Sequence, residues 1–260
     1  MIPLLIGLAA GLILGATAAL AWRQTHASVS PDDGEGATAR AELVSKISHE
    51  LKNPIMSVKG LASTGSRLYA SMDDDERLEL FRLIDLEAGR LKLIADETST
   101  ALKIDAGTLT YDPREEDVGA LVEQTAWRTP VGDHPIRVST ESGLIARVDR
   151  TRLAEVVTKL VDNAAKFSPS GSPIDVRAAR GHDGIEVSVR DDGPGIPDER
   201  KADVRRRYSA WRPPGYEEVP GAGLGLYVAG AHVGALGGRM EIGDAEPSGT
   251  ILRVWLPSGG

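Results

Sequence analysis

Residues 150–190, RTRLAEVVTKLVDNAAKFSPSGSPIDVRAARGHDGIEVSVR, decide the fold class of this 260-residue chain. Apolar residues recur at helical spacing across residues 150–166, which predicts a helix with one buried face. Two β-rich segments follow, at residues 174–179 and 185–190, and the turn sequence GHDG separates them. A helix followed by an antiparallel pair of strands predicts a layer of helices on a sheet.

The rest of residues 108–260 repeats this mixture of helix and strand. We therefore predict a two-layer α/β sandwich over that range. The further helices are expected at residues 118–126 and 225–236, and the further strands at residues 108–111, 136–140, 144–148, 239–242 and 251–256.

Residues 39–107 predict two long helices. Leu43, Ile47, Leu51 and Ile55 fall four apart on a helix that runs to about residue 69. Ser71 and the acidic residues after it indicate the start of a second helix, which Gly107 ends. The pair forms an antiparallel hairpin with little core of its own, so we predict a homodimer in which two hairpins form a four-helix bundle. The alternative is a helical pair packed on its own C-terminal domain. The fold class is thus α+β.

The N-terminal segment is apolar. Residues 2–22 carry no charge and as a helix would span roughly 31 Å, enough to cross a bilayer core. A cleaved signal peptide is the alternative, but no Lys or Arg precedes the run. Arg23 follows at once, so we expect a single-pass helix in the inner (plasma) membrane with the remainder cytoplasmic. The domains are then an anchor at 1–23, a linker at 24–38, the hairpin at 39–107 and the sandwich at 108–260.

Composition excludes several kinds of protein. Asp and Glu number 38 against 30 Lys and Arg, a formal charge of −8, which argues against a nucleic-acid partner. The chain has no cysteine, so disulfides, thiolate zinc sites and a thiol nucleophile are excluded.

Residues 48–54, SHELKNP, lie on the first predicted helix. His49 falls off the apolar stripe, and a neutral imidazole nitrogen is a good nucleophile. The Glu50 carboxylate can hold the ring and accept its proton, and Asn53, one turn later, could orient a water. Alone, this segment is more readily explained as a solvated helix face.

Three more segments suggest a phosphate ligand. Asn163 and Lys166, on one helix face, could bind a hard cation and phosphate. Residues 191–197, DDGPGIP, offer a carboxylate at a strand end beside glycines. Residues 221–226, GAGLGL, open a helix whose bare backbone N–H groups could cradle phosphate; it is not a Walker A loop, because no Lys-Ser/Thr follows. Each segment alone is also an ordinary helix end or turn.

Together and in this order, the four segments resemble the sensor histidine kinase family of two-component signalling. The resemblance covers residues 39–257, with an H box at 48–54, an N box at 158–168 and glycine boxes at 191–197 and 221–226. It implies that His49 receives the γ-phosphoryl group of ATP, with Glu50 as base and Asn53 positioning water. It implies a lid at residues 198–220. The implied partner is the receiver domain of a response regulator, and Mg²⁺ would bind at Asn163. The nucleotide-binding residues implied are Asn163, Lys166, Phe167, Asp191, Gly193, Gly195, Gly221, Gly223, Leu224, Gly225, Leu226 and Thr250.

Two positions depart from the family pattern. Lys159 stands where the N box usually has Asn, and where the wider Bergerat-fold ATPases carry a water-activating Glu. The family's Phe-rich box (the Phe box) should fall near residues 204–208, which read VRRRY here: Arg205 replaces an expected Phe, and Tyr208 alone keeps an aromatic ring. Despite these departures, the resemblance predicts a sensor histidine kinase that autophosphorylates and also dephosphorylates its regulator. The alternatives are a degenerate kinase acting as phosphatase or scaffold, and an ATPase or chaperone-like machine.

Overall fold

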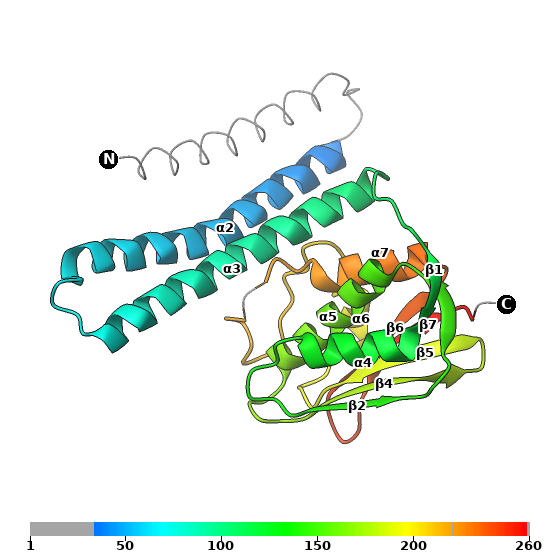
Figure 1. Ribbon diagram of the computed structural model, residues 1–260. Coiled ribbons are helices and arrows are strands. Elements are labelled where there is room, and N and C mark those ends of the chain that lie inside the picture. The colour runs from blue at the N-terminus through cyan, green and yellow to red at the C-terminus, as the bar shows by residue number, and fades with distance from the viewer. Residues whose placement is uncertain (1–33, 220, 259–260) are drawn as a thin grey trace. The chain divides into compact units, whose positions relative to one another are not determined.

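The computed structural model describes residues 34–219 and 221–258. The two helices predicted between residues 39 and 107 are α2 (Gly34–Leu68) and α3 (Asp74–Asp105) (Figure 1). None of the helices within this described part of the chain is long and apolar enough to cross a membrane. The predicted anchor at residues 1–23 lies outside the described residues.

Helix α3 begins with a capping box. The Asp73 carboxylate accepts from the Glu76 N–H at 2.8 Å, and the Glu76 carboxylate accepts from the Asp73 N–H at 3.0 Å. Such a cap contributes about 1 kcal/mol. The cap is Asp73 and not the Ser71 that the sequence suggested, because the Ser71 hydroxyl donates to the Leu68 carbonyl at the end of α2.

The rest of the chain alternates helix and strand as predicted, with two exceptions: a short helix at Asp198–Lys201 was not predicted, and the first strand lies elsewhere. Residues 108–111 are not a strand; the first strand is Arg114–Asp117, because Ile145–Val148 pairs with these residues. The elements are β1 (Arg114–Asp117), α4 (Val118–Arg128), β2 (Ile136–Thr140), β3 (Ile145–Val148), α5 (Arg150–Phe167), β4 (Ile174–Gly181), β5 (Gly184–Arg190), α6 (Asp198–Lys201), α7 (Gly225–Ala235), β6 (Arg239–Asp244) and β7 (Thr250–Leu256).

The main sheet has five strands in the order β2-β4-β5-β7-β6, and β1 with β3 forms a separate two-stranded sheet. Strands β2 and β4 are parallel, and the other neighbours in the main sheet are antiparallel. Helices α4, α5 and α7 pack on this sheet (Figure 1). The two-layer α/β sandwich that the sequence predicted is confirmed.

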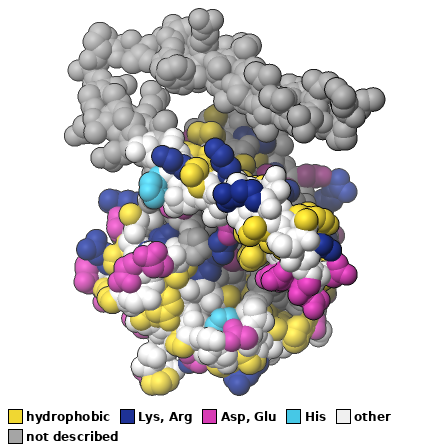
Figure 2. Space-filling model, turned by 90° about the vertical axis from the view of Figure 1, so that its left-hand side faces the viewer, with side chains coloured by type: hydrophobic (Ala, Val, Ile, Leu, Met, Phe, Trp, Pro, Cys, Tyr) yellow, Lys and Arg dark blue, Asp and Glu magenta, His cyan; other side chains and the backbone are white. Residues whose placement is uncertain are grey.

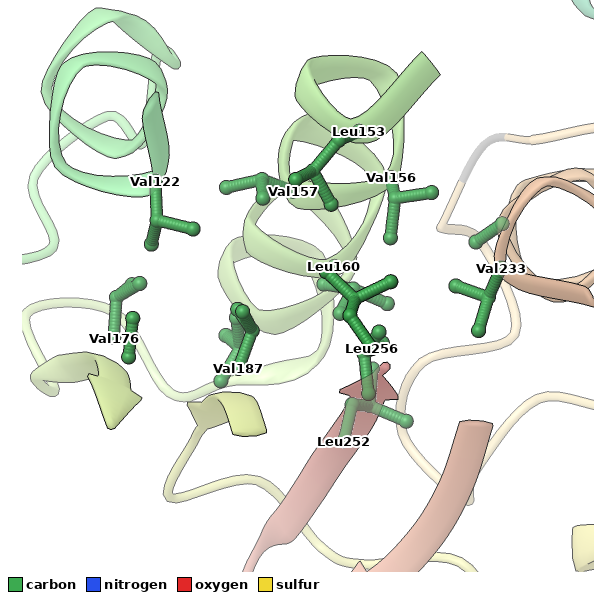
Figure 3. Close-up of a cluster of buried hydrophobic side chains, with 14 of the residues drawn as sticks. Val122, Leu153, Val156, Val157, Leu160, Val176, Val187, Val233, Leu252 and Leu256 are labelled. Carbon is green, nitrogen blue, oxygen red and sulfur yellow. The ribbon is translucent and has the colours of Figure 1, made fainter. Parts of the chain in front are cut away.

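The core lies between α5 and the sheet. Leu153, Val157 and Leu160 of α5 are fully buried and face side chains from the strands (Figure 3). Val187 of β5 and Leu252 of β7 are among these strand residues. Burying each such side chain contributes about 1.5–3 kcal/mol, so this layer fixes where α5 places its polar face.

The hairpin keeps apolar side chains exposed, whereas the sandwich has a closed core. In Figure 2, hydrophobic side chains lie among acidic and basic ones on the face that is turned to the viewer. An exposed apolar stripe on a helix is typical of a surface that a partner covers. The exposed large hydrophobic residues on or beside α2 and α3 are Ile55, Met56, Leu68, Tyr69, Leu78, Phe81, Leu83, Leu86, Leu93 and Leu102.

Candidate nucleotide-binding site

A cavity opens between α5, the loop after β5 and the start of α7. About 880 Å³ of space lies within its walls when the open solvent at its mouth is included. The sequence-predicted residues that line it are Asn163, Lys166, Phe167, Asp191, Gly195, Gly221, Gly223, Gly225, Leu226 and Thr250. Gly193 and Leu224 are next to lining residues in the chain, and Leu224 is fully buried.

Asp191 is the buried acid of this cavity. It follows β5 and is 2% exposed, and its Oδ1 accepts from the N–H groups of Gly193 at 2.9 Å and Thr250 at 3.1 Å. Burial raises the pKa of the Asp191 carboxyl to about 6, although the two backbone N–H groups act in the opposite direction. Both bonds go to Oδ1, so Oδ2 is the oxygen that could accept from an exocyclic amine such as that of adenine.

Glycines let backbone approach Asp191 from two sides. A Cβ on Gly193 would lie 2.4 Å from the Phe167 carbonyl oxygen, and one on Gly249 would lie 1.9 Å from the Asp191 carbonyl oxygen. Gly249 also has φ +122°, which side chains disfavour. The sequence reasoning did not assign Gly249 to the site, because its role depends on a contact with a residue 58 positions earlier in the chain.

Helix α5 brings three predicted residues to the cavity. Lys166 and Asn163 are three apart, and the Lys166 ammonium is 2.6 Å from the Asp162 carboxylate. The Phe167 ring lies 6.0 Å from the ring of Tyr216 in the lid segment. The α5 face therefore offers an amide, an ammonium and an aromatic ring to one ligand.

Arg212 organises the lid segment. Its guanidinium donates to the carbonyl oxygens of Ser209, Trp211, Val219 and Gly221, at 2.8–3.4 Å. These bonds tie residues on either side of the segment 213–218. Burial lowers the pKa of Arg212, and the Glu50 carboxylate of the H box acts in the opposite direction. Arg212 was not predicted from the sequence, because it lies in none of the boxes and no carboxylate partner for it is evident from the sequence.

Lys159 forms an ion pair with α3. Its ammonium lies 2.7 Å from the Glu97 carboxylate, and both side chains are largely buried, at 11% and 14% exposed. Both residues line the cavity. The position that departs from the family pattern thus holds a cation at the site, already paired with an acid.

The H-box residues lie on α2 and are not among the residues that line the cavity. His49 and Asn53 are exposed and Glu50 is partly buried, as the off-stripe position of His49 predicted. The structure therefore brings the nucleotide-site residues together and leaves the imidazole accessible on its helix.

The eroded Phe box keeps part of its packing. Tyr208 packs against the cluster of Ala101, Leu224 and Val228, and Val204 is buried in the main core. Arg205 is exposed and donates to the Met240 carbonyl at 3.2 Å. An arginine therefore stands at the surface where the family pattern has a ring.

Comparisons with known proteins identify both domains. Residues 148–260 match the family described as "Histidine kinase-, DNA gyrase B-, and HSP90-like ATPase", which defines an ATP-binding domain. Residues 39–107 match the "His Kinase A (phospho-acceptor) domain". The chain therefore carries a phospho-acceptor domain followed by an ATP-binding domain, and it belongs to the sensor histidine kinase family.

Individual relatives agree with this assignment. The chain is 30% identical over 236 residues to the signal transduction histidine-protein kinase AfsQ2 of Streptomyces coelicolor, covering 84% of this chain and 42% of that protein. It is 31% identical over 239 residues to the histidine-protein kinase/phosphatase MprB of Mycobacterium bovis, covering 86% of this chain and 45% of that protein. The chain thus spans less than half the length of these two relatives. The structure of the Acinetobacter baumannii histidine kinase AdeS has the same fold, with a TM-score of 0.62 at 22% identity over 82% of this chain and 98% of that chain.

Proposed function

We propose that this protein autophosphorylates His49 from Mg-ATP and passes the phosphoryl group to an aspartate of a response regulator. The observation that carries the proposal is the braced Asp191 carboxylate in a cavity that also presents Asn163 and Lys166, in one chain with an exposed His49. Phosphoryl transfer needs mainly positioning and charge neutralisation, and these residues supply both.

The chemistry follows from the residues present. Asp191 Oδ2 accepts from the adenine amine, Phe167 lies against the base, and Lys166 neutralises phosphate charge. An imidazole nitrogen of His49 forms a bond to the γ-phosphorus while the bond to the β–γ bridging oxygen breaks, and ADP leaves with that electron pair. The Glu50 carboxylate holds the other side of the ring and accepts the proton that the imidazole releases.

A divalent cation fits this site only with help from the nucleotide. The described residues contain no cluster of three His, Cys, Asp or Glu side chains that could hold a metal by itself. Mg²⁺ usually takes one or two protein oxygens and completes its shell with phosphates and water. The Asn163 amide oxygen would be the protein ligand, and the ion would neutralise phosphate charge when bound.

The proposal includes the assembly and its location. The exposed apolar side chains of α2 and α3 support a homodimeric four-helix bundle. The uncharged run at residues 2–22 supports a single-pass anchor with the catalytic part cytoplasmic. The phospho-acceptor domain supports a receiver domain as partner, with Asn53 placed to orient water for dephosphorylation.

Labelling with γ-³²P-ATP tests the proposal. His49→Gln should abolish acid-labile incorporation while nucleotide binding stays unchanged, because His49 lies outside the cavity. His182→Gln is the matched control, since His182 is also exposed and pairs only locally with Asp183 at 2.8 Å. Labelling that persists in His49→Gln and depends on another residue would refute the nucleophile assignment.

A degenerate kinase, active only as phosphatase or scaffold, is the second candidate. The Lys159–Glu97 ion pair and the exposed Arg205 favour it, because neither residue follows the family pattern. A wild-type chain that binds ATP, forms no phosphohistidine and still dephosphorylates its regulator would establish this candidate instead. Steady ATP turnover in His49→Gln would instead indicate an ATPase.

A further inference from the structure

One face of α3 touches the ATP-binding domain at three successive turns. Glu97, Ala101 and Asp105 are four residues apart, so they lie in one row along the helix. Glu97 pairs with Lys159 of α5, and Ala101 packs against the glycine box. Asp105 accepts from the Tyr227 hydroxyl at 2.5 Å and pairs with Arg207. The row therefore combines an apolar centre with charged contacts at both ends.

The end at Glu97 differs from the end at Asp105 because it lies in the nucleotide cavity. Lys159, Asn163 and Lys166 follow one another at four and three residues on α5, so one face of α5 presents all three. Glu97 lines the same cavity and is 14% exposed on its side chain. The cavity that would hold a polyphosphate thus contains the Glu97 carboxylate, and this carboxylate is already paired with the Lys159 ammonium.

One ammonium cannot fully neutralise two anionic groups that both lie close to it. A carboxylate and a phosphate a few ångströms apart repel each other, and the repulsion is stronger in a partly desolvated site than in water. The phosphates of a nucleotide therefore compete with Glu97 for the Lys159 ammonium. By linkage, whatever favours one of the two contacts must disfavour the other.

We propose that Lys159 is a further nucleotide-binding residue, whose ammonium exchanges the Glu97 carboxylate for a phosphate oxygen when ATP binds. The exchange releases α3 from α5 at this end of the row, while Ala101 and Asp105 keep their contacts. Nucleotide binding is thereby coupled to the position of the hairpin that carries the phospho-acceptor histidine. The inference rests on the proposed function, because it requires that the cavity binds a nucleotide.

Replacing Glu97 tests the exchange. Glu97→Gln removes the charge at nearly constant volume, so the full chain should bind a non-hydrolysable ATP analogue about fivefold more tightly by calorimetry. The matched control is Asp96→Asn, which removes the same charge one residue earlier, from an exposed pair with Lys92 at 2.6 Å. Asp96→Asn should leave the dissociation constant unchanged. Adenosine, which has no phosphate, should bind equally to wild type and Glu97→Gln.

A Lys159→Asn background distinguishes the proposed exchange of the Lys159 ammonium from a purely structural role of the Lys159–Glu97 ion pair. Lys159→Asn should weaken binding of the analogue in the wild-type chain and should weaken it more in the Glu97→Gln chain, because there the ammonium no longer has to give up the Glu97 carboxylate to contact phosphate. Equal affinity in wild type and Glu97→Gln, or weaker binding in Glu97→Gln, would overturn the inference. So would a Lys159→Asn substitution that leaves the affinity of the Glu97→Gln chain unchanged. Absence of nucleotide binding by the wild type would instead refute the proposed function itself.

Discussion

Replacing Asp191 by Asn should stabilise the nucleotide-free protein and at the same time abolish its recognition of adenine. The carboxylate is 2% exposed, and burial raises its pKa from 3.8 to about 6. A shift of about two pKa units corresponds to about 3 kcal/mol, by which the folded protein disfavours the ionised acid. Asn keeps an oxygen for the Gly193 and Thr250 N–H groups and carries no charge.

The sign of the pH dependence follows from the raised pKa. An acid whose pKa is higher in the folded state than in the unfolded state lowers stability as the pH rises from about 4 to about 6, and the loss is constant above that. The difference in unfolding free energy between Asp191→Asn and wild type should therefore be near zero at pH 4. It should reach about 1–3 kcal/mol in favour of the variant at pH 8.

Urea unfolding of both full chains at several pH values measures this difference. Calorimetry with ATP measures the second effect, an affinity loss of at least about tenfold, because the Asn amide would present a donor to the donating adenine amine. An Asp191→Asn protein that is less stable than wild type at pH 8 would refute the burial argument. A variant that keeps full ATP affinity would refute the assignment of the adenine contact.

Two other substitutions test the framework around the site. Gly249→Ala should destabilise the fold by more than about 2 kcal/mol and weaken ATP binding, because its Cβ would lie 1.9 Å from the Asp191 carbonyl oxygen. The control is Gly89→Ala, in open space on α3, which should be neutral or stabilising. Thermal unfolding measures the stability of both variants. The nearby His232 ring and Arg152 lower the pKa of Glu155 to about 2, so Glu155→Gln should lose about 1–2 kcal/mol at pH 7, after allowance for solvent screening of this half-exposed group. That loss should shrink as the pH falls from about 4.5 towards 2, and a loss that is constant with pH would contradict the assignment.

Local patterns in the sequence were sufficient for most of the fold. The apolar spacing of α5 and the alternation in β7 report which face of each element is buried, because periods of 3.6 and 2 are set by backbone geometry alone. The strand expected at residues 108–111 was wrong because strand formation needs a partner, and β3 pairs with Arg114–Asp117. The boxes also contain many of the residues that line the cavity, since each box is a short contiguous segment.

The sequence alone did not predict the contacts between segments that lie far apart in the chain. Gly249 against Asp191, Arg212 on the carbonyls of the lid, and Glu97 on Lys159 join residues that no motif relates. By itself, the sequence determined the helical hairpin, the α/β sandwich and the chemical types gathered for a nucleotide. Only the tertiary structure decided which carboxylate is buried and which cation is already paired, because burial and pairing depend on distances in space and not on spacing along the chain.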